Sequence, residues 1–262
     1  MRRSYFKLKM QEIHNNFISF VKYIWQDFIE GSHHKKISEK FNLLPKNKIK
    51  KLIINIPPRH SKSSFASFLL PAWMLGCTPN LKITQIVNDN ENPTFLFSKT
   101  KKLIDKPSYK KIFKTRLKKI SEGEKKLHTE QGGEYYLTSF GSEITDLDVD
   151  LVIIDDPHSE KDSLNPHRLK STFEWYRQKL LKILNPNTII VLVMTRCNIN
   201  DLTGQLIKID SKTKEDKWEI LKLPVITASQ KPLWPEFWKL DELKKIKDSV
   251  SEQEWNFKWM QN

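Results

Sequence analysis

The stretch best suited to chemistry is residues 58–63, Pro-Arg-His-Ser-Lys-Ser, which we call the PRHSKS loop. It follows a run of strand-forming residues and precedes an apolar segment. In phosphate-binding loops a lysine contacts the β- and γ-phosphates and the next Ser or Thr holds Mg²⁺. Their pattern is GxxxxGK followed by Ser or Thr. With Lys62 and Ser63 aligned to it, Ile56 and Ser61 stand at the two glycine positions, so the PRHSKS loop departs from the pattern.

The physical properties of the loop nevertheless favour an anion. Lys62 and Ser63 stand where a strand gives way to a helix, and helix N-termini attract anions without any glycine. Two prolines before Arg59 stiffen the entry to the loop, and a positioned arginine can stabilise charge in phosphoryl transfer. Ser61 is compatible with such a loop if its φ is negative. The alternative is a basic strand-to-helix turn without a ligand.

Two adjacent carboxylates, Asp155 and Asp156, end the apolar run 151–154. In phosphate-loop NTPases an acid at a strand end contacts Mg²⁺, usually through water. The next acid can orient or deprotonate the attacking water. The alternative is that two exposed acids simply end a strand before Pro157. A Lys-Ser loop at a matching strand end favours the first interpretation.

Apolar runs alternate with helical segments along the chain. Buried strands are predicted at 51–56, 81–87, 151–156 and 188–194, and further strands at 134–140 and 218–223. Helices are predicted at 4–30, 35–44, 63–75, 99–126 and 166–184, and another opens at Asp201. Strands that are apolar throughout indicate a parallel sheet covered on both faces, which binds ligands at the carboxyl ends of its strands. The PRHSKS loop, the acid pair and Thr195 all follow such ends, so the sequence predicts an α/β fold with its site there.

Composition limits the partners and the compartment. The formal net charge of +14 favours an anionic partner, with nucleic acid first, although a solvated Lys-rich surface would give the same value. Cys77 and Cys197 lack metal-ligand spacing and fit a reduced, intracellular protein. No segment has the apolar length of a signal peptide or a membrane span, so we expect a soluble protein without a membrane partner.

The segment 99–126 is strongly basic, with twelve Lys or Arg against three Asp or Glu. It could face DNA or a neighbouring subunit, and a solvated pair of Lys-rich helices is the alternative. The candidate DNA-binding residues in it are Lys101, Lys102, Lys110 and Lys111.

Aromatic and imidazole side chains offer weaker signals. His33 and His34 could lie near an adenine, but helix capping or simple exposure is the stronger expectation for each. His60 could bond a phosphate or only the loop backbone, and His158 is expected in an exposed turn. Five tryptophans are expected to pack in the core or between subdomains, namely Trp218, Trp234, Trp238, Trp255 and Trp259.

Several segments together, from about residue 30 onward, resemble the ATPase domain of the large terminase subunit of tailed phages and prophages. In order they are PPRHSKS, LPAWMLG, YKKIF, the pair Gly132–Gly133, LVIIDDP, MTR, DLTGQLI and LWPEFW. That family uses both PPRHGKS and PPRHSKS, and the resemblance is carried by the order and spacing of the whole set. It implies a P-loop NTPase fold, with a mainly parallel sheet flanked by helices. The expected layout is a helical N-terminal region at 1–45, an ATPase domain at 46–230 and a C-terminal helical linker at 231–262.

The resemblance also implies a function. The implied function is that of a motor protein, which hydrolyses ATP with Mg²⁺ and drives double-stranded DNA into a procapsid in the cytoplasm of a bacterial host cell. The implied partners are the small terminase subunit, the portal and procapsid, and further copies in a homo-oligomeric ring. The implied catalytic residues are Arg59, Asp156 and Thr195, and Ser63 and Asp155 would hold the metal. The nucleotide would be bound by Pro58, Arg59, His60, Ser61, Lys62, Ser63 and Ser64. Arg196 could assist, or form a salt bridge to Asp155 or Asp201.

Some segments depart from the family pattern. The segment 141–150 lacks the expected glycines, Cys197–Asn198 replace a Trp-His pair, and Asn88–Asp89 replace a Ser-Tyr pair. The alternative function is therefore a degenerate prophage remnant that binds nucleic acid without catalysis. A helicase is disfavoured because no second motor-like half is visible. Members of the family usually continue into a metal-dependent nuclease domain, and we expect no nuclease activity here because no acidic cluster follows Asp156.

Overall fold

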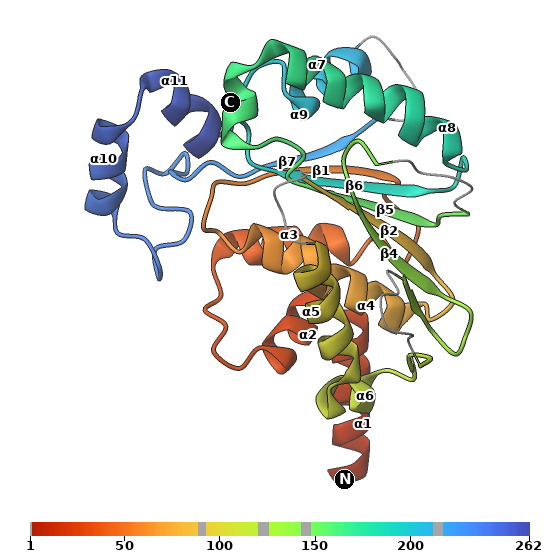
Figure 1. Cartoon of the computed structure of the whole chain (residues 1–262). Coiled ribbons are helices and arrows are strands. Elements are labelled where there is room, and N and C mark those ends of the chain that lie inside the picture. The colour runs from red at the N-terminus through yellow and green to blue at the C-terminus, as the bar shows by residue number, and fades with distance from the viewer. Residues whose placement is uncertain (1, 89–92, 120–125, 143–147, 212–216) are drawn as a thin grey trace.

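The computed structural model describes residues 2–88, 93–119, 126–142, 148–211 and 217–262. It has three layers, with a central sheet between two groups of helices (Figure 1). In this view helices α1 to α6 lie below the sheet, α7 to α9 lie above it, and α10 and α11 stand to one side. This is the α/β architecture that the apolar strands predict.

The sheet contains seven strands within the described residues, in the order β3-β4-β2-β5-β6-β1-β7. All neighbouring pairs are parallel except β3 and β4, which are antiparallel. Strand β6 lies between β1 and β5, and its register is set by pairs such as Ile53↔Leu192 and Ile153↔Val191. The strands are β1 (Lys51–Asn55), β2 (Lys82–Val87), β3 (Lys126–His128), β4 (Glu134–Ser139), β5 (Leu151–Asp155), β6 (Ile189–Met194) and β7 (Glu219–Lys222).

Helices cover both faces of this sheet. The lower layer comprises α1 (Arg2–Asn15), α2 (Phe17–Ile24), α3 (Ser32–Phe41), η1 (Ser64–Leu69), α4 (Leu70–Cys77), α5 (Pro93–Asp105) and α6 (Pro107–Ile112). The upper layer comprises η2 (Glu160–Leu164), α7 (Pro166–Trp175), η3 (Tyr176–Leu180), α8 (Leu181–Ile183) and α9 (Leu202–Asp210). The C-terminal elements are α10 (Leu240–Ser249), α11 (Glu252–Glu254) and η4 (Trp255–Trp259).

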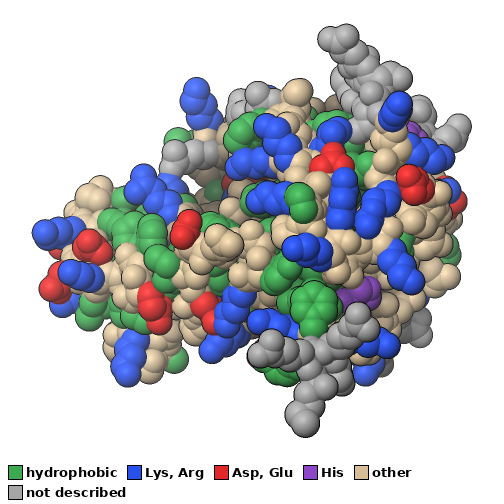
Figure 2. All heavy atoms as spheres, turned by 90° about the horizontal axis from the view of Figure 1, so that it is seen from below, with side chains coloured by type: hydrophobic (Ala, Val, Ile, Leu, Met, Phe, Trp, Pro, Cys, Tyr) green, Lys and Arg blue, Asp and Glu red, His purple; other side chains and the backbone are tan. Residues whose placement is uncertain are grey.

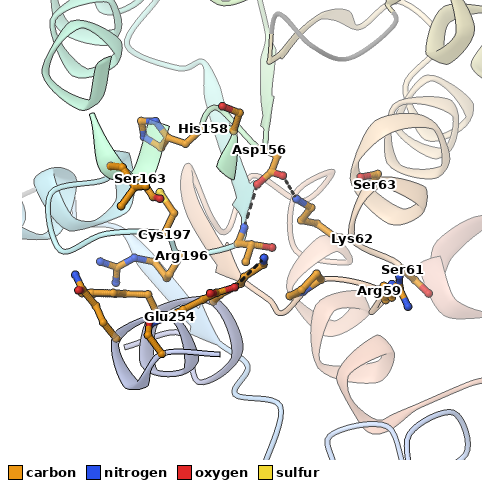
Figure 3. A pocket seen from close by; sticks show the side chains of 18 of the residues that line it. Arg59, Ser61, Lys62, Ser63, Asp156, His158, Ser163, Arg196, Cys197 and Glu254 are labelled. Carbon is orange, nitrogen blue, oxygen red and sulfur yellow. Dashed lines mark hydrogen bonds and ion pairs between the residues drawn. The ribbon is translucent and has the colours of Figure 1, made fainter. Parts of the chain in front are cut away.

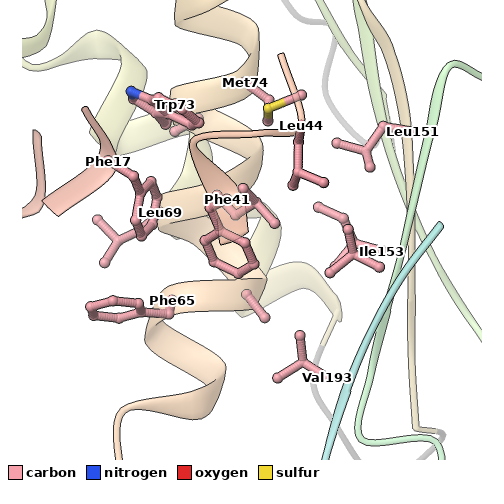
Figure 4. Packing of buried hydrophobic residues seen from close by; sticks show 14 of the residues in the cluster. Phe17, Phe41, Leu44, Phe65, Leu69, Trp73, Met74, Leu151, Ile153 and Val193 are labelled. Carbon is pink, nitrogen blue, oxygen red and sulfur yellow. The ribbon is translucent and has the colours of Figure 1, made fainter. Parts of the chain in front are cut away.

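Alternate residues of each strand belong to two separate hydrophobic cores, because successive side chains of a strand point to opposite faces of the sheet. Leu52 and Ile54 of β1 belong to the lower core, whereas Ile53 belongs to the upper one. In the lower core the ring of Phe17 meets Phe65 and Trp73 edge to face, each at 5.4 Å between centroids (Figure 4). The burial of both faces explains why the strands are apolar throughout.

Two predicted helices are wrong in extent. The helix predicted at 4–30 is split by Asn16, whose side-chain oxygen accepts the Ser19 N–H at 3.1 Å and thereby caps α2. The chain then leaves the helix after Ile24 and does not continue to Gly31. The basic segment 99–126 is helical only as far as Ile112, where α6 ends, and residues 126–128 form strand β3. Residues 120–125 lie outside the described part of the chain.

The C-terminal elements pack around a small core of their own. Its buried members are Val225, Leu243, Trp255 and Trp259, so these two tryptophans pack as the sequence predicts. In the described part of the chain, no helix has the length and apolar character that crossing a membrane requires.

Candidate functional site

The loops after β1, β5 and β6 meet at one edge of the sheet, because these three strands are parallel neighbours. Asn55 pairs with Met194 and Asp155 with Val193, so the residues that follow each strand come together. They face a cavity of about 690 Å³. Its lining includes Arg59, Lys62, Ser63 and Asp156 (Figure 3), and also Thr195, so these predicted residues come together around one cavity.

The PRHSKS loop turns sharply through left-handed backbone. Arg59 has a φ of 59° and Ser61 a φ of 62°, so the negative φ that would make Ser61 compatible with the loop is not present. The reason is geometric: the helical turns begin at Lys62, and the Ser61 carbonyl accepts the Phe65 N–H at 3.0 Å. Glycine adopts this conformation without a steric cost, whereas another residue is strained by about 1–2 kcal/mol. Ser61 therefore occupies a position with a physical preference for glycine.

The helix after the loop begins with wide π-type turns. In η1 the Leu70 N–H donates to the Phe65 carbonyl, five residues back. Pro71 stands at the start of α4, where it has no N–H to offer and its ring would meet the carbonyl four residues earlier in an ordinary helix. Widened turns commonly occur at functional sites. Here they lie directly behind Lys62 and Ser63.

Lys62 forms an ion pair with Asp156, and its side chain is only 10% exposed. Asp156 has a φ of 47° and is held on two sides: its N–H donates to the Val193 carbonyl at 2.9 Å, and its Oδ1 accepts the Thr195 N–H at 3.2 Å. The Thr195 hydroxyl donates to the Ile56 carbonyl at 2.9 Å. The ends of β1, β5 and β6 are thus tied together around one carboxylate that faces the cavity.

The two residues predicted to hold a metal are placed differently. Ser63 is exposed at the cavity, whereas Asp155 is only 4% exposed and is not among the lining residues. The Asp155 carboxylate accepts a hydrogen bond from the Ser67 hydroxyl of η1, one helical turn beyond Ser63. Among the described residues no group of three or more His, Cys, Asp or Glu side chains could hold a metal ion. Of the two adjacent aspartates, it is Asp156 that lines the cavity.

Arg196 forms a buried salt bridge with Asp201. Its Nε lies 2.8 and 3.0 Å from the two carboxylate oxygens of Asp201, which confirms one of the partners predicted for it. Asp201 is fully buried and also caps α9 by accepting the Gly204 N–H at 2.9 Å. A Cβ on Gly204 would lie 2.0 Å from the Ile199 carbonyl oxygen, so the turn after β6 needs glycine there. This turn is a rigid support for Thr195.

Three histidines support the loop from below. His60 is fully buried, does not line the cavity and bonds the Pro58 carbonyl through its Nδ1 at 2.8 Å, so it takes the backbone role of the two considered and the predicted nucleotide contact of its side chain is wrong. Its ring lies 5.4 Å from that of His33, which in turn lies 3.8 Å from that of His34. Burial, and then the neighbouring imidazoles, lower the pKa of His33 to about 2 and that of His34 to about 3, and burial lowers the pKa of His60. All three are therefore neutral at pH 7.

Among the histidines outside the loop, His34 caps a helix as expected, whereas His33 and His158 are buried and their expected exposure is wrong. His33 and His34 are fully buried, although His34 does act at a helix end, where its Nδ1 accepts the Gly31 N–H at 2.8 Å. His158 is 6% exposed, and its Nε2 accepts the Leu202 N–H at 2.9 Å. Burial lowers the pKa of His158, so this side chain acts as a neutral acceptor at the start of α9.

The fold is similar to those of solved phage proteins. The crystal structure of the HK97 bacteriophage large terminase superposes with a TM-score of 0.56 and 16% identity, covering 89% of this chain and 50% of that one. A point mutant of the Thermus phage P74-26 large terminase ATPase domain gives a TM-score of 0.58 and 11% identity over 92% of this chain and 96% of that one. The chain has the fold of a large terminase ATPase domain.

The other comparisons show how far the similarity to known proteins extends. A second structure of the P74-26 large terminase ATPase domain gives a TM-score of 0.53 and 11% identity, covering 81% of this chain and 88% of that domain. No protein-family model and no curated protein sequence matches this chain. The chain spans half the length of the HK97 large terminase, so the likeness concerns the ATPase part of the fold.

One wall of the cavity was missed by the sequence interpretation. It is formed by the C-terminal segment, residues 251–261, whose lining members are Ser251, Gln253, Glu254, Phe257 and Lys258. The segment reaches the site because the Gln261 side chain accepts the Arg196 N–H at 3.0 Å. No motif marks this contact, because it joins residues that are 65 positions apart.

The candidate DNA-binding lysines fall into two classes. Lys101 and Lys110 both pair with Asp105, at 2.9 and 3.1 Å, whereas Lys102 and Lys111 are exposed. All four lie on α5 and α6, in the layer of helices below the sheet (Figure 1). Seen from below, that face carries many Lys and Arg side chains and fewer acids (Figure 2). The face is basic, and two of its four candidates are partly neutralised.

Proposed function

We propose that this chain is the ATP-hydrolysing motor domain of a phage-type large terminase, which drives double-stranded DNA into a procapsid. The observation that carries the proposal is the arrangement of Lys62, Asp156 and Thr195 around one cavity, at the ends of three neighbouring parallel strands. A cation at a loop-to-helix turn, a carboxylate beside it and a hydroxyl on the next strand are the groups that phosphoryl transfer requires. The terminase ATPase fold supports the same assignment.

The side chains present suit Mg·ATP. The backbone N–H groups of the first helical turn after Ser61 point toward the loop, and helix N-termini bind phosphates. Lys62 would hold the β- and γ-phosphates, and Arg59, which is exposed at the cavity, would stabilise charge that develops on the γ-phosphate. Mg²⁺ prefers oxygen ligands and keeps several waters, so the Ser63 hydroxyl and waters would hold it, without the Asp155 carboxylate, which is buried against Ser67. The ion would neutralise charge on the phosphate oxygens.

Asp156 is suited to orient the attacking water. Its carboxylate lines the cavity and is fixed by the Thr195 N–H, so it has a defined direction. Once Lys62 turns to a phosphate, the carboxylate is available to accept a hydrogen bond from water. Thr195 lies one residue before Arg196, which is anchored to Asp201. A change in the position of the γ-phosphate would therefore be transmitted through Thr195 to the turn after β6. We assign the coupling role to Thr195 on this ground.

The wider role includes partners and a place in the cell. The motor would act on double-stranded DNA in the cytoplasm of a bacterial host, with the small terminase subunit, the portal and procapsid, and further copies in a ring. The basic face formed by α5 and α6 would meet the DNA phosphates. The competing function is nucleic-acid binding without catalysis, as in a degenerate prophage remnant.

The deciding experiment measures nucleotide binding and turnover in the same set of variants. With Mg·ATP at a hundred times its Kd, the free energy of unfolding of the wild type should rise by about 2.7 kcal/mol. Lys62→Ala should abolish this increase, whereas Lys48→Ala, which removes an exposed lysine outside the cavity, should retain it. An equal response of the wild type and Lys62→Ala to Mg·ATP would show that the loop does not hold phosphate.

Turnover then separates the motor from the remnant. Asp156→Asn should keep nucleotide binding, because the amide preserves size and leaves Lys62 for the phosphates, but should depress ATP hydrolysis in the presence of long duplex DNA. Arg59→Ala should lower turnover by a factor on the order of 10³. A wild type that binds nucleotide and DNA but hydrolyses nothing would establish the competing function.

A further inference from the structure

The C-terminal segment is a fixed wall of the cavity. Trp255 and Trp259 bury their rings in a core with Val225 and Leu243, and the Val225 N–H donates to the Trp259 carbonyl at 2.8 Å. Gln261, fully buried with a φ of 61°, accepts the Arg196 N–H with its Oε1 and donates from its Nε2 to the Lys258 carbonyl at 2.6 Å. The backbone of Lys258 is therefore tied to the residue that follows Thr195.

Lys258 presents a cation to the cavity from this wall. Its Nζ lies 3.2 Å from the Glu254 carboxylate, one helical turn earlier, and both side chains line the cavity. Figure 3 shows Glu254 on the wall across the cavity from Lys62 and Asp156. The Lys258 side chain is only 25% exposed, and burial lowers its pKa. A partly buried ammonium group gains more from an anion than one on the open surface.

The charges around the cavity favour an anionic ligand. Its charged lining residues are four cations, Arg59, Lys62, Arg196 and Lys258, and two acids, Asp156 and Glu254. Because Arg196 is paired with Asp201, which lies outside the lining, three cations face two acids and an excess of one positive charge remains. Lys258 has three N–H donors, so it can keep its contact with Glu254 and still donate to a ligand oxygen.

We propose that Lys258 is a phosphate-binding residue, held in direction by Glu254, which contacts a polyphosphate bound against the PRHSKS loop from the opposite wall. The inference rests on the proposed nucleotide site and adds a binding residue from a segment some 200 positions away from Lys62 in sequence. A polyphosphate held between Lys62 and Lys258 would join the loop to the C-terminal segment. The nucleotide would thereby fix the distance between the two walls.

The test compares two probes in four proteins, with Lys62→Ala as a fifth that reports on the nucleotide site itself. The probes are the non-hydrolysable ATP analogue AMP-PNP and inorganic tripolyphosphate, each with Mg²⁺, and their Kd values are measured by calorimetry. The proteins are the wild type, Lys258→Met, Lys258→Arg and Lys245→Met. Methionine keeps the apolar stem of Lys258 and removes the charge, and Lys245 is an exposed lysine of α10 outside the cavity.

We expect Lys258→Met to raise the Kd of both probes at least tenfold, which corresponds to about 1.4 kcal/mol. Lys258→Arg should recover part of the affinity, and Lys245→Met should match the wild type. An unchanged Kd in Lys258→Met would overturn the proposal, and so would a loss confined to AMP-PNP, because it would place Lys258 at the nucleoside. If the wild type binds neither probe, the proposed nucleotide site itself is wrong. If only the role of Lys258 is wrong, the wild type should bind both probes and Lys62→Ala should lose both.

Discussion

The buried histidine cluster beneath the PRHSKS loop should make the fold sensitive to mild acid. His33 and His34 have pKa values of about 2 and 3 in the folded protein, lowered first by burial. In the unfolded chain a histidine has a pKa near 6.5. Below pH 6.5 the unfolded chain therefore binds protons at these histidines that the folded protein does not bind. The stability contributed by the neutral rings is present above pH 6.5 and is lost as the pH falls below it.

The magnitude follows from the unfolded value alone, because both folded values lie well below pH 5. Between pH 7.5 and 5.0, one such histidine lowers the free energy of unfolding by about 2 kcal/mol, and His33 with His34 lowers it by about 4 kcal/mol. This is a large part of the 5–15 kcal/mol that typically holds a domain folded. Since His60 packs on His33, the loss would release the PRHSKS loop.

The assay is urea unfolding, followed by tryptophan fluorescence, at pH 7.5 and pH 5.0. His33→Phe keeps an aromatic ring beside His34 and Trp234 and removes the titrating group. Relative to the wild type, this variant should lose about 2 kcal/mol less between the two pH values. His167→Phe makes the same substitution on the exposed surface of α7 and serves as the control. The reasoning is refuted if His33→Phe and the wild type lose the same free energy on acidification.

Two further predictions concern the loop and the basic face. Ser61→Gly should raise the free energy of unfolding by up to about 1 kcal/mol, because glycine removes the left-handed strain but adds freedom to the unfolded chain. Ser61→Val should lower it, and urea unfolding of both variants shows whether the signs differ as they must. Replacing Lys102 and Lys111 with Gln should reduce the slope of log K against log salt for duplex DNA by up to about 1.8. The same change at Lys101 and Lys110, which pair with Asp105, should reduce the slope less, and equal slopes would contradict the distinction.

The parts of the fold that the sequence predicts well are those governed by short apolar runs. The runs containing Ile53, Ile153 and Val191 form neighbouring strands, since most residues of a strand that is buried on both faces of a sheet are apolar. The chemistry at their ends follows directly, because parallel strands end at one edge. The Lys-rich segment 99–126 was less predictable. Thr115 is fully buried and bonds the Leu75 carbonyl at 2.8 Å, so tertiary contacts override the helical tendency of the lysines.

The parts of the site that the sequence hides depend on contacts between distant residues. Asp156 meets Lys62 because its backbone turns through a positive φ, while Asp155 turns to Ser67, and two adjacent aspartates give no sign of this division. The burial of His33 likewise depends on Trp234, which lies 5.2 Å away between ring centroids but 201 residues later in the chain. Such pairs have no local pattern that could be recognised.

The position of β1 within the sheet has a consequence for how the protein is made. Strand β1 pairs with β6 and β7. The partners of Asn55 in these strands are Met194 and Lys222, which lie 139 and 167 residues further along the chain. At the usual speed of synthesis, about 5–20 residues per second, the strand that leads into the PRHSKS loop waits roughly 7 to 33 s for its neighbours. Helices α2, α3 and α4, which share a core with Leu52 and Ile54, are completed earlier and can cover one face of β1. The face of Ile53 stays open until α9 has been made, and the edge of β1 that pairs with β7 stays open until the ribosome has passed Lys222, so the nascent chain exposes an aggregation-prone strand until late in its translation.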